Sequence, residues 1–284
     1  MDVSIAIALN QAAEKLRAQE VNEPRMEAAL LLSHILGRDR TFLIAHDDEL
    51  LSAEQSHIFD GLVLRRASGE PLQYITGHQE FFKLDFEVTP DVLIPRSETE
   101  LIVEAVLELF PQNVEFNFAD VGTGSGCIAI SILHERAQAR ATAIDKSCRA
   151  LEVAQRNAAR HQVNDRLRMM ESDLFAALPR EETFDLIVSN PPYIQTSALK
   201  TLQREVRLEP QFALDGGMDG LTLIRRLLSD APAFLRARGY LIFEIGFDQE
   251  DSLRRITDQT IWELSEIRQD LQGLGRTVIL RKRI

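Results

Sequence analysis

The sequence predicts an α/β fold in which helices flank a mostly parallel sheet, preceded by a small helical bundle. Three observations support this prediction. Strand and helix patterns alternate from about residue 96 onward, which is typical of a parallel sheet with helical crossovers. A glycine-rich loop, Gly122–Gly126, follows the first of these strands. Before residue 75, by contrast, apolar residues recur at helical spacing.

The first 75 residues predict a compact bundle of about four helices. Ile5, Leu9 and Leu16 fall on one helical face. Pro24 fits the first turn of a helix, where a missing N–H is tolerated. Ser52-x-x-Gln55 has the form of a capping box, so we expect another helix to begin there.

A different pattern occupies residues 76–95, which we interpret as a hairpin linker. Phe81–Val88 alternates partly between apolar and polar residues, as paired strands do. Residues 96–284 then predict the α/β domain. Its expected strands are Val114–Val121, Ala141–Asp145, Leu167–Met170, Phe184–Ser189 and Tyr240–Ile245, its expected helices are Ile128–Leu133, Ala150–Ala159 and Leu221–Leu235, and Leu264–Arg268 and Thr277–Arg281 are expected to pair as a closing antiparallel hairpin.

Composition narrows the class of protein. The 284 residues carry a formal net charge of −12, which disfavours broad electrostatic binding to a phosphate backbone. Cys127 and Cys148 are the two cysteines, too few for a disulfide framework. The sequence has no signal-peptide pattern and no long apolar run. We therefore expect a cytoplasmic protein that binds neither membranes nor nucleic acid.

The glycine loop predicts a site for a nucleoside-type cofactor. Gly122, Gly124 and Gly126 suit a sharp turn from strand to helix, and ligands bind beyond the carboxyl ends of such strands. The spacing, with Thr123 and Ser125 between the glycines, lacks the lysine of a phosphate-binding loop and the third glycine of a dinucleotide fingerprint.

Two acidic positions extend this predicted site. Asp145 ends the next strand, where a carboxylate can accept hydrogen bonds from both ribose hydroxyls. Asp173 and Leu174 follow the third strand, at a position that lies beside an adenine in this architecture. Asp173 would accept from the exocyclic amine and Leu174 would pack on the ring, although Asp173 also suits a plain helix cap.

The segment Asn190-Pro191-Pro192-Tyr193 follows the fourth strand directly. Prolines cannot continue a central strand, so the chain must leave the sheet in a rigid, extended corner. The Asn190 side chain and the Pro191 carbonyl would then face the ligand cleft as fixed acceptors. They would hold the N–H bonds of a planar amide, whose delocalised lone pair makes it a poor nucleophile. Tyr193 could stack on that planar group.

These residues resemble the peptide chain release factor N5-glutamine methyltransferases, the PrmC or HemK family. The likeness covers essentially the whole chain. Asn-Pro-Pro-Tyr also marks a wider group that includes DNA adenine methyltransferases. Other segments that match the narrower family are Gly69–Gly77, Val92–Glu100, Leu208–Gly217, Phe243–Gly246 and Asp270–Gly273.

The resemblance implies a seven-stranded class I methyltransferase sheet over residues 96–284, with S-adenosylmethionine as cofactor. The substrate would be the glutamine of the Gly-Gly-Gln motif in class I release factors, and residues 1–75 would recognise that partner. Gly122–Gly126 would hold the methionine part, Asp145 the ribose, and Leu174 the adenine. Asn190 would contact both cofactor and substrate, and Asn190–Tyr193 would hold the glutamine.

Two alternatives remain open from the sequence. An adenine-N6 nucleic-acid methyltransferase would use the same chemistry on a flipped base, but we would expect a basic surface or a target-recognition domain. A non-catalytic binding module would keep the fold without turnover. A metal enzyme is not indicated, because the six histidines are scattered and never spaced as His-x-x-x-His.

Overall fold

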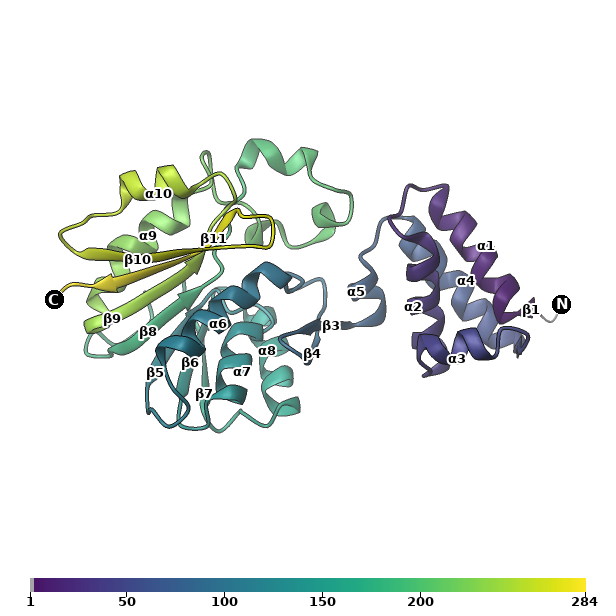
Figure 1. The fold of residues 1–284 in the computed structure, drawn as a ribbon, viewed down its shortest axis with the longest axis horizontal. Coiled ribbons are helices and arrows are strands. Elements are labelled where there is room, and N and C mark those ends of the chain that lie inside the picture. The colour runs from purple at the N-terminus through teal and green to yellow at the C-terminus, as the bar shows by residue number, and fades with distance from the viewer. Residues whose placement is uncertain (1–2) are drawn as a thin grey trace. The chain divides into compact units, whose positions relative to one another are not determined.

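A computed structural model describes residues 3–284, which form two compact units, each seen as a separate set of elements in Figure 1. The helical unit extends to His78 and also includes Gln203–Leu208. The α/β unit consists of Gln79–Leu202 and Glu209–Ile284. The chain therefore leaves the α/β unit once, late in the sequence, and returns to it.

The helical unit is built on helices whose apolar faces meet. Leu16, Leu31, Leu32 and Val63 are completely buried in its core. The described part has five helices rather than about four, because two short helices supplement the three long ones. Its elements are β1 (Val3–Ser4), α1 (Ile5–Arg17), α2 (Pro24–Leu36), α3 (Arg40–Ala45), β2 (Leu50–Leu51), α4 (Ala53–Ala67) and α5 (Leu72–Thr76).

The predicted helix starts in this unit are confirmed. Pro24 is the first residue of α2. At the start of α4, the backbone N–H of Gln55 donates to the Ser52 hydroxyl at 3.1 Å, and the Ser52 N–H donates to the Gln55 side chain at 2.8 Å. The capping box thus satisfies two backbone donors that the first turn leaves without a partner.

The α/β unit contains a seven-stranded, mostly parallel sheet in the order β10-β11-β9-β8-β5-β6-β7. The five strands β5 to β9 run parallel to one another, and β11 pairs antiparallel with both β9 and the edge strand β10. The predicted fold class and closing hairpin are confirmed. The strands are β5 (Asn117–Val121), β6 (Arg140–Asp145), β7 (Leu167–Glu171), β8 (Phe184–Ser189), β9 (Leu235–Glu244), β10 (Trp262–Gln269) and β11 (Gly275–Lys282).

Helices cover both faces of this sheet (Figure 1). The helices are α6 (Glu100–Leu109), α7 (Cys127–Glu135), α8 (Cys148–Arg160), α9 (Thr222–Asp230) and α10 (Glu250–Ile256). Residues of α6, α7 and α8 form one apolar cluster with the sheet, and residues of α9 and α10 form another. Burial on both faces explains why the central strands are nearly continuous in apolar residues.

The predicted hairpin is present as β3 (His78–Phe81) and β4 (Leu84–Glu87). Two of its aromatic side chains, Phe81 and Phe86, are completely buried in the apolar cluster shared with α6, α7 and α8. The hairpin is thus part of the core of the α/β unit and not only a connection.

Several predicted boundaries are wrong, and one of them is the strand expected from Tyr240, which begins at Leu235. The helix expected over Leu221–Leu235 ends at Asp230, because Pro232 lies in the following 3-10 turn and Leu235 already begins β9. The first strand of the sheet begins at Asn117 rather than Val114. Val114 is 41% exposed, so the alternating pattern continues beyond the residues that pair.

Candidate functional site

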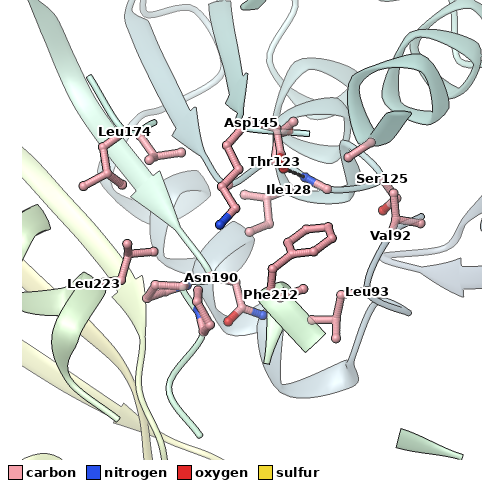
Figure 2. A pocket seen from close by; sticks show the side chains of 18 of the residues that line it. Val92, Leu93, Thr123, Ser125, Ile128, Asp145, Leu174, Asn190, Phe212 and Leu223 are labelled. Carbon is pink, nitrogen blue, oxygen red and sulfur yellow. Dashed lines mark hydrogen bonds between the residues drawn. The ribbon is translucent and has the colours of Figure 1, made fainter. Parts of the chain in front are cut away.

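A cavity of about 460 Å³ lies at the carboxyl ends of the parallel strands of the α/β unit. Figure 2 shows Asp145 and Thr123 near one end of this cavity and Asn190 and Phe212 near the other. The predicted residues that line it are Gly122, Thr123, Gly124, Ser125, Asp145, Asp173, Leu174, Asn190, Pro191 and Pro192.

The glycine loop turns the chain from β5 into α7. Gly122, Gly124 and Gly126 all have positive φ, between 56° and 81°, a conformation that side chains with a Cβ rarely adopt. At Gly126 a Cβ would also come within 3.2 Å of Ala154 Cβ, on α8. Gly126, the one glycine of the loop outside the cavity lining, therefore lets α7 approach its neighbours.

Asp145 ends β6 and is directed toward this loop. One carboxylate oxygen accepts from the Gly124 N–H at 3.0 Å, and the other accepts from the Ser147 N–H at 2.9 Å. Each oxygen keeps a second lone pair. Burial raises the pKa of Asp145, while the Ser147 and Gly124 hydrogen bonds lower it. A fixed carboxylate with two remaining acceptor sites fits the paired hydroxyls of a ribose.

A second carboxylate, Asp120 on β5, lies beneath the loop and was not predicted. Its Oδ2 accepts from the Thr123 hydroxyl at 2.7 Å and from the Ala129 N–H at 3.2 Å. Among the described residues, Asp120 Oδ1 and Ser125 Oγ are buried without a hydrogen-bond partner. Burial raises the pKa of Asp120 to about 7. Ser125 lines the cavity, so its hydroxyl gives this end a free polar group for a ligand.

Asp173 and Leu174 both line the cavity, after β7. The Asp173 carboxylate accepts two hydrogen bonds from Arg226 of α9, at 3.0 and 3.1 Å. Leu174 is buried and has a φ of +53°, unusual for a leucine. Arg226 also lines the cavity and was missed. Arg226 lies on α9, 53 residues after Asp173 in the chain, and no motif around it indicates a site residue.

Asn190, Pro191 and Pro192 follow β8 and line the cavity together. The Asn190 Nδ2 group donates to the Thr99 hydroxyl at 3.0 Å. No hydrogen bond within residues 3–284 occupies Asn190 Oδ1. The side-chain oxygen is therefore available as an acceptor.

Tyr193 is placed differently from its three predecessors. It is not among the residues that line the cavity; its ring packs against the apolar cluster of α9 and α10, and its hydroxyl donates to Glu244 at 2.9 Å. Burial, with the negative charge of Glu244, raises the pKa of Tyr193 well above its ordinary value. The phenol thus stays protonated and remains a donor.

Thr99 and Glu244, which hydrogen-bond to Asn190 and Tyr193 respectively, were not predicted as site residues. The Thr99 hydroxyl donates to Glu244 Oε2 at 2.6 Å, and both side chains are almost fully buried. Thr99 lies in a short 3-10 turn before α6, and Glu244 is the last residue of β9. Glu244 ends an apolar run at the carboxyl end of β9 and lies in the family-like segment Phe243–Gly246, as Thr99 lies in Val92–Glu100; these signals could have singled out both residues.

Residues 3–284 contain neither a membrane-spanning helix nor a metal-binding cluster. None of the described helices is long and apolar enough to cross a membrane. No group of three or more His, Cys, Asp and Glu side chains in these residues is arranged to hold a metal ion.

Two family models match the chain. Residues 8–77 match the PrmC N-terminal domain, and residues 98–209 match the methyltransferase small domain. A release factor glutamine methyltransferase from Koribacter versatilis is 42% identical over 276 residues, which cover 97% of each chain. Another from Moorella thermoacetica is 47% identical over 247 residues, which cover 87% of each chain.

Solved structures agree with the fold. A methyltransferase from Pyrococcus furiosus is 20% identical, with a TM-score of 0.53 over 82% of this chain and all of the other. At this identity the likeness shows a class I methyltransferase fold and nothing finer.

The cofactor is S-adenosylmethionine, and the cavity suits it. The chain presents a carboxylate with two free acceptor sites at Asp145, a buried apolar side chain at Leu174 and a glycine-lined turn with an unpaired hydroxyl at Ser125. These groups match a ribose, an adenine face and a charged amino-acid end. With relatives that match it over nearly its whole length, the chain belongs to the release factor glutamine methyltransferase family, whose members are S-adenosylmethionine-dependent enzymes.

Proposed function

We propose that this enzyme methylates the side-chain amide nitrogen of the glutamine in the Gly-Gly-Gln motif of class I peptide chain release factors. One observation carries the proposal: Asn190 lines the cavity with its amide NH2 tied to Thr99 and its carbonyl oxygen unused. The printed names of the full-length relatives support the same substrate.

The chemistry needs acceptors because an amide nitrogen is a weak nucleophile. Its lone pair is delocalised into the carbonyl. Asn190 Oδ1 and the Pro191 carbonyl would accept the two N–H bonds of the glutamine, orient the group and stabilise positive charge that develops on nitrogen. When bound, S-adenosylmethionine supplies an electrophilic methyl group. The proton leaves to solvent after the nitrogen has been methylated, so the chain needs no strong base.

Cofactor contacts are assigned to the other end of the cavity. In our proposal the loop Gly122–Gly126, with Thr123 and Ser125, holds the methionine part. Asp145 binds the ribose hydroxyls, Asp173 accepts from the adenine amine, and Leu174 packs on the ring. Asp173 already binds Arg226 through both oxygens, each of which retains a lone pair.

The corner that follows β8 would hold the glutamine. Pro191 and Pro192 fix its extended path. Tyr193 was expected to stack on the substrate amide. Its bond to Glu244 and its burial in the apolar cluster favour a supporting role instead, so we assign it the positioning of Asn190–Pro192.

Recognition of the protein partner is assigned to the N-terminal helices of residues 1–75, with the hairpin of residues 76–95 as linker. We place the enzyme in the cytoplasm, where release factors act, and expect no direct contact with nucleic acid. The adenine-N6 alternative is not favoured, since the relatives that match the whole chain carry the name of a glutamine methyltransferase.

Mass spectrometry gives the direct test. The enzyme is incubated with S-adenosylmethionine and a class I release factor, and one added methyl is expected on the Gly-Gly-Gln glutamine. A release factor with that glutamine changed to asparagine is the matched control and should gain none. An adenine-containing DNA duplex serves as the competing substrate. Methylation of the duplex with no change in the release factor would refute the proposal.

A further inference from the structure

A buried carboxylate lies directly beside the Asn190 corner. In the parallel pair of β8 and β9, Ser189 is opposite Phe243, so the next residues, Asn190 and Glu244, lie side by side at the carboxyl ends of the two strands. Glu244 is 1% exposed. One of its oxygens accepts from the Thr99 hydroxyl at 2.6 Å and the other from the Tyr193 hydroxyl at 2.9 Å.

The donor and acceptor capacities of these side chains give the direction of each hydrogen bond once the charge of Glu244 is set. Burial raises the pKa of Glu244, while the Thr99 and Tyr193 hydrogen bonds lower it, and our inference takes Glu244 as ionised. An ionised carboxylate only accepts, so the single proton of the Thr99 hydroxyl points at Glu244. The Thr99 oxygen can then only accept from Asn190. The group 3.0 Å from it must be the Asn190 NH2 and not the carbonyl. With Glu244 ionised, the hydrogen bonds therefore select one orientation of the Asn190 amide, which heavy-atom positions alone leave ambiguous.

We propose that Glu244 and Thr99 act as a positioning pair that selects which end of the Asn190 amide faces the substrate. The inference rests on the proposed function, because it gives Asn190 Oδ1 the task of accepting from the substrate amide. Neither residue is a catalytic residue in this account; both act through Asn190. Tyr193 occupies the second oxygen of Glu244 and so keeps the carboxylate turned toward Thr99.

Loss of the pair would have a specific consequence. Without an acceptor at residue 99, the two orientations of the Asn190 amide become similar in energy. In the reversed orientation its NH2 would face the NH2 of the substrate, donor against donor. The enzyme would still bind cofactor, since the cofactor contacts assigned above do not involve Thr99, but fewer molecules would hold the glutamine productively.

Thr99→Val tests this with little change in shape, because it replaces the hydroxyl by a methyl group. Thr99→Ser is the matched control that keeps the hydroxyl. We expect Thr99→Val to lower kcat about tenfold, the effect of one lost hydrogen bond of this kind. Thr99→Ser should stay near the wild-type rate. Cofactor affinity by calorimetry should remain close to wild type in both. Thr99→Val should lower the melting temperature by a few degrees, because one oxygen of the buried Glu244 loses its donor, whereas Thr99→Ser should keep it.

A double-mutant cycle separates positioning from a general structural role. In an Asn190→Ala background, Thr99→Val should lower kcat no further, because the group that it orients is already gone. A full additional tenfold loss would overturn the inference. So would a folded Thr99→Val enzyme with the wild-type kcat. Thr99→Ala removes the same acceptor without adding a methyl and carries the same expectation if the valine variant does not fold.

A readout without substrate distinguishes this inference from the proposed function. In a spectrum of the 15N-labelled protein, the Asn190 side-chain NH2 signals are identified by their loss in Asn190→Ala. One of these protons should exchange slowly with water in wild type and in Thr99→Ser, and rapidly in Thr99→Val. Slow exchange in all three would refute the positioning pair even if the release factor is methylated. A wild-type enzyme that leaves the release factor unmodified would refute the function instead.

Discussion

The two ends of the cavity are built in different ways. At the cofactor end, the main contacts join residues that are close in the chain or on neighbouring strands: Asp145 accepts from Ser147 and Gly124, and the Gly122 N–H donates to the Ile144 carbonyl at 2.7 Å. At the substrate end, side chains from three separate parts of the sequence meet, at Thr99, Asn190 and Glu244.

Because of this difference, we expect substitutions at the two ends to affect different properties of the enzyme. The cofactor end relies on backbone conformation and backbone N–H groups, so a substitution there should change affinity for S-adenosylmethionine. The substrate end relies on the direction of individual side-chain hydrogen bonds. A substitution there should change turnover while the cofactor still binds.

Asn190→Ala should give the largest effect. It removes one of the two proposed acceptors for the substrate N–H bonds, so methyl transfer should fall by on the order of a hundredfold or more. Cofactor affinity, measured by isothermal titration calorimetry, should remain mostly intact. A rate close to wild type would show that the substrate end does not depend on this side chain.

Asp145→Ala should instead lower the affinity for the cofactor. Loss of two hydrogen bonds to a charged group should weaken S-adenosylmethionine binding by roughly 10- to 100-fold. Asp145→Asn retains one acceptor, so its affinity for S-adenosylmethionine should lie between those of Asp145→Ala and wild type. Melting temperatures of both variants control for the lost bond to Gly124. Unchanged affinity in Asp145→Ala would remove the ribose assignment.

Asp120→Asn should have the smallest effect on turnover. It should mainly change how the free energy of unfolding depends on pH. The folded-state pKa of about 7 lies above the ordinary value of 3.8, so the folded protein holds this proton more tightly than the unfolded chain. The stabilisation is present in full below about pH 4 and is lost as the pH rises toward 7. Between pH 5 and 6, the free energy of unfolding of wild type should fall relative to the variant by about 1.4 kcal/mol per pH unit, and near pH 7 by about half as much.

Urea denaturation without cofactor, at several pH values from 5 to 8, measures this difference. Other titrating groups, including Glu244, whose pKa burial also raises, are common to both proteins and cancel in the comparison. Parallel stability curves for wild type and Asp120→Asn would mean that Asp120 is ionised throughout this range.

Much of the fold could be predicted because its signals are local. The capping box at Ser52, the strand at Phe184–Ser189 and the proline corner after it all depend on residues within a few positions of one another. Strand boundaries were less reliable. Val114 has the pattern of a strand residue but lies exposed outside the sheet, because pairing depends on the neighbouring strand.

Other features depended on contacts between distant residues. The Gln203–Leu208 segment belongs to the helical unit, where Glu205 accepts a 2.9 Å hydrogen bond from the buried Arg66, which also binds Glu27. Arg66 has the local pattern of an ordinary surface arginine at a helix end. Nothing near it in the chain indicates a buried ion pair with a residue so far along the sequence.

The sequence by itself determined the chain order of the seven strands, the positive-φ glycine turn, the acidic residue at the end of β6 and the rigid corner at Asn190. These follow from backbone preferences and hydrophobic periodicity, which act over short distances. Only the tertiary structure decided that Thr99 links Asn190 to Glu244 by hydrogen bonds and that Arg226 donates to Asp173. It also decided that Tyr193 packs in the apolar cluster and not in the cavity lining. Hydrogen bonds between side chains require partners at about 3 Å, and that proximity arises only when the sheet register and the packing of distant segments bring them together.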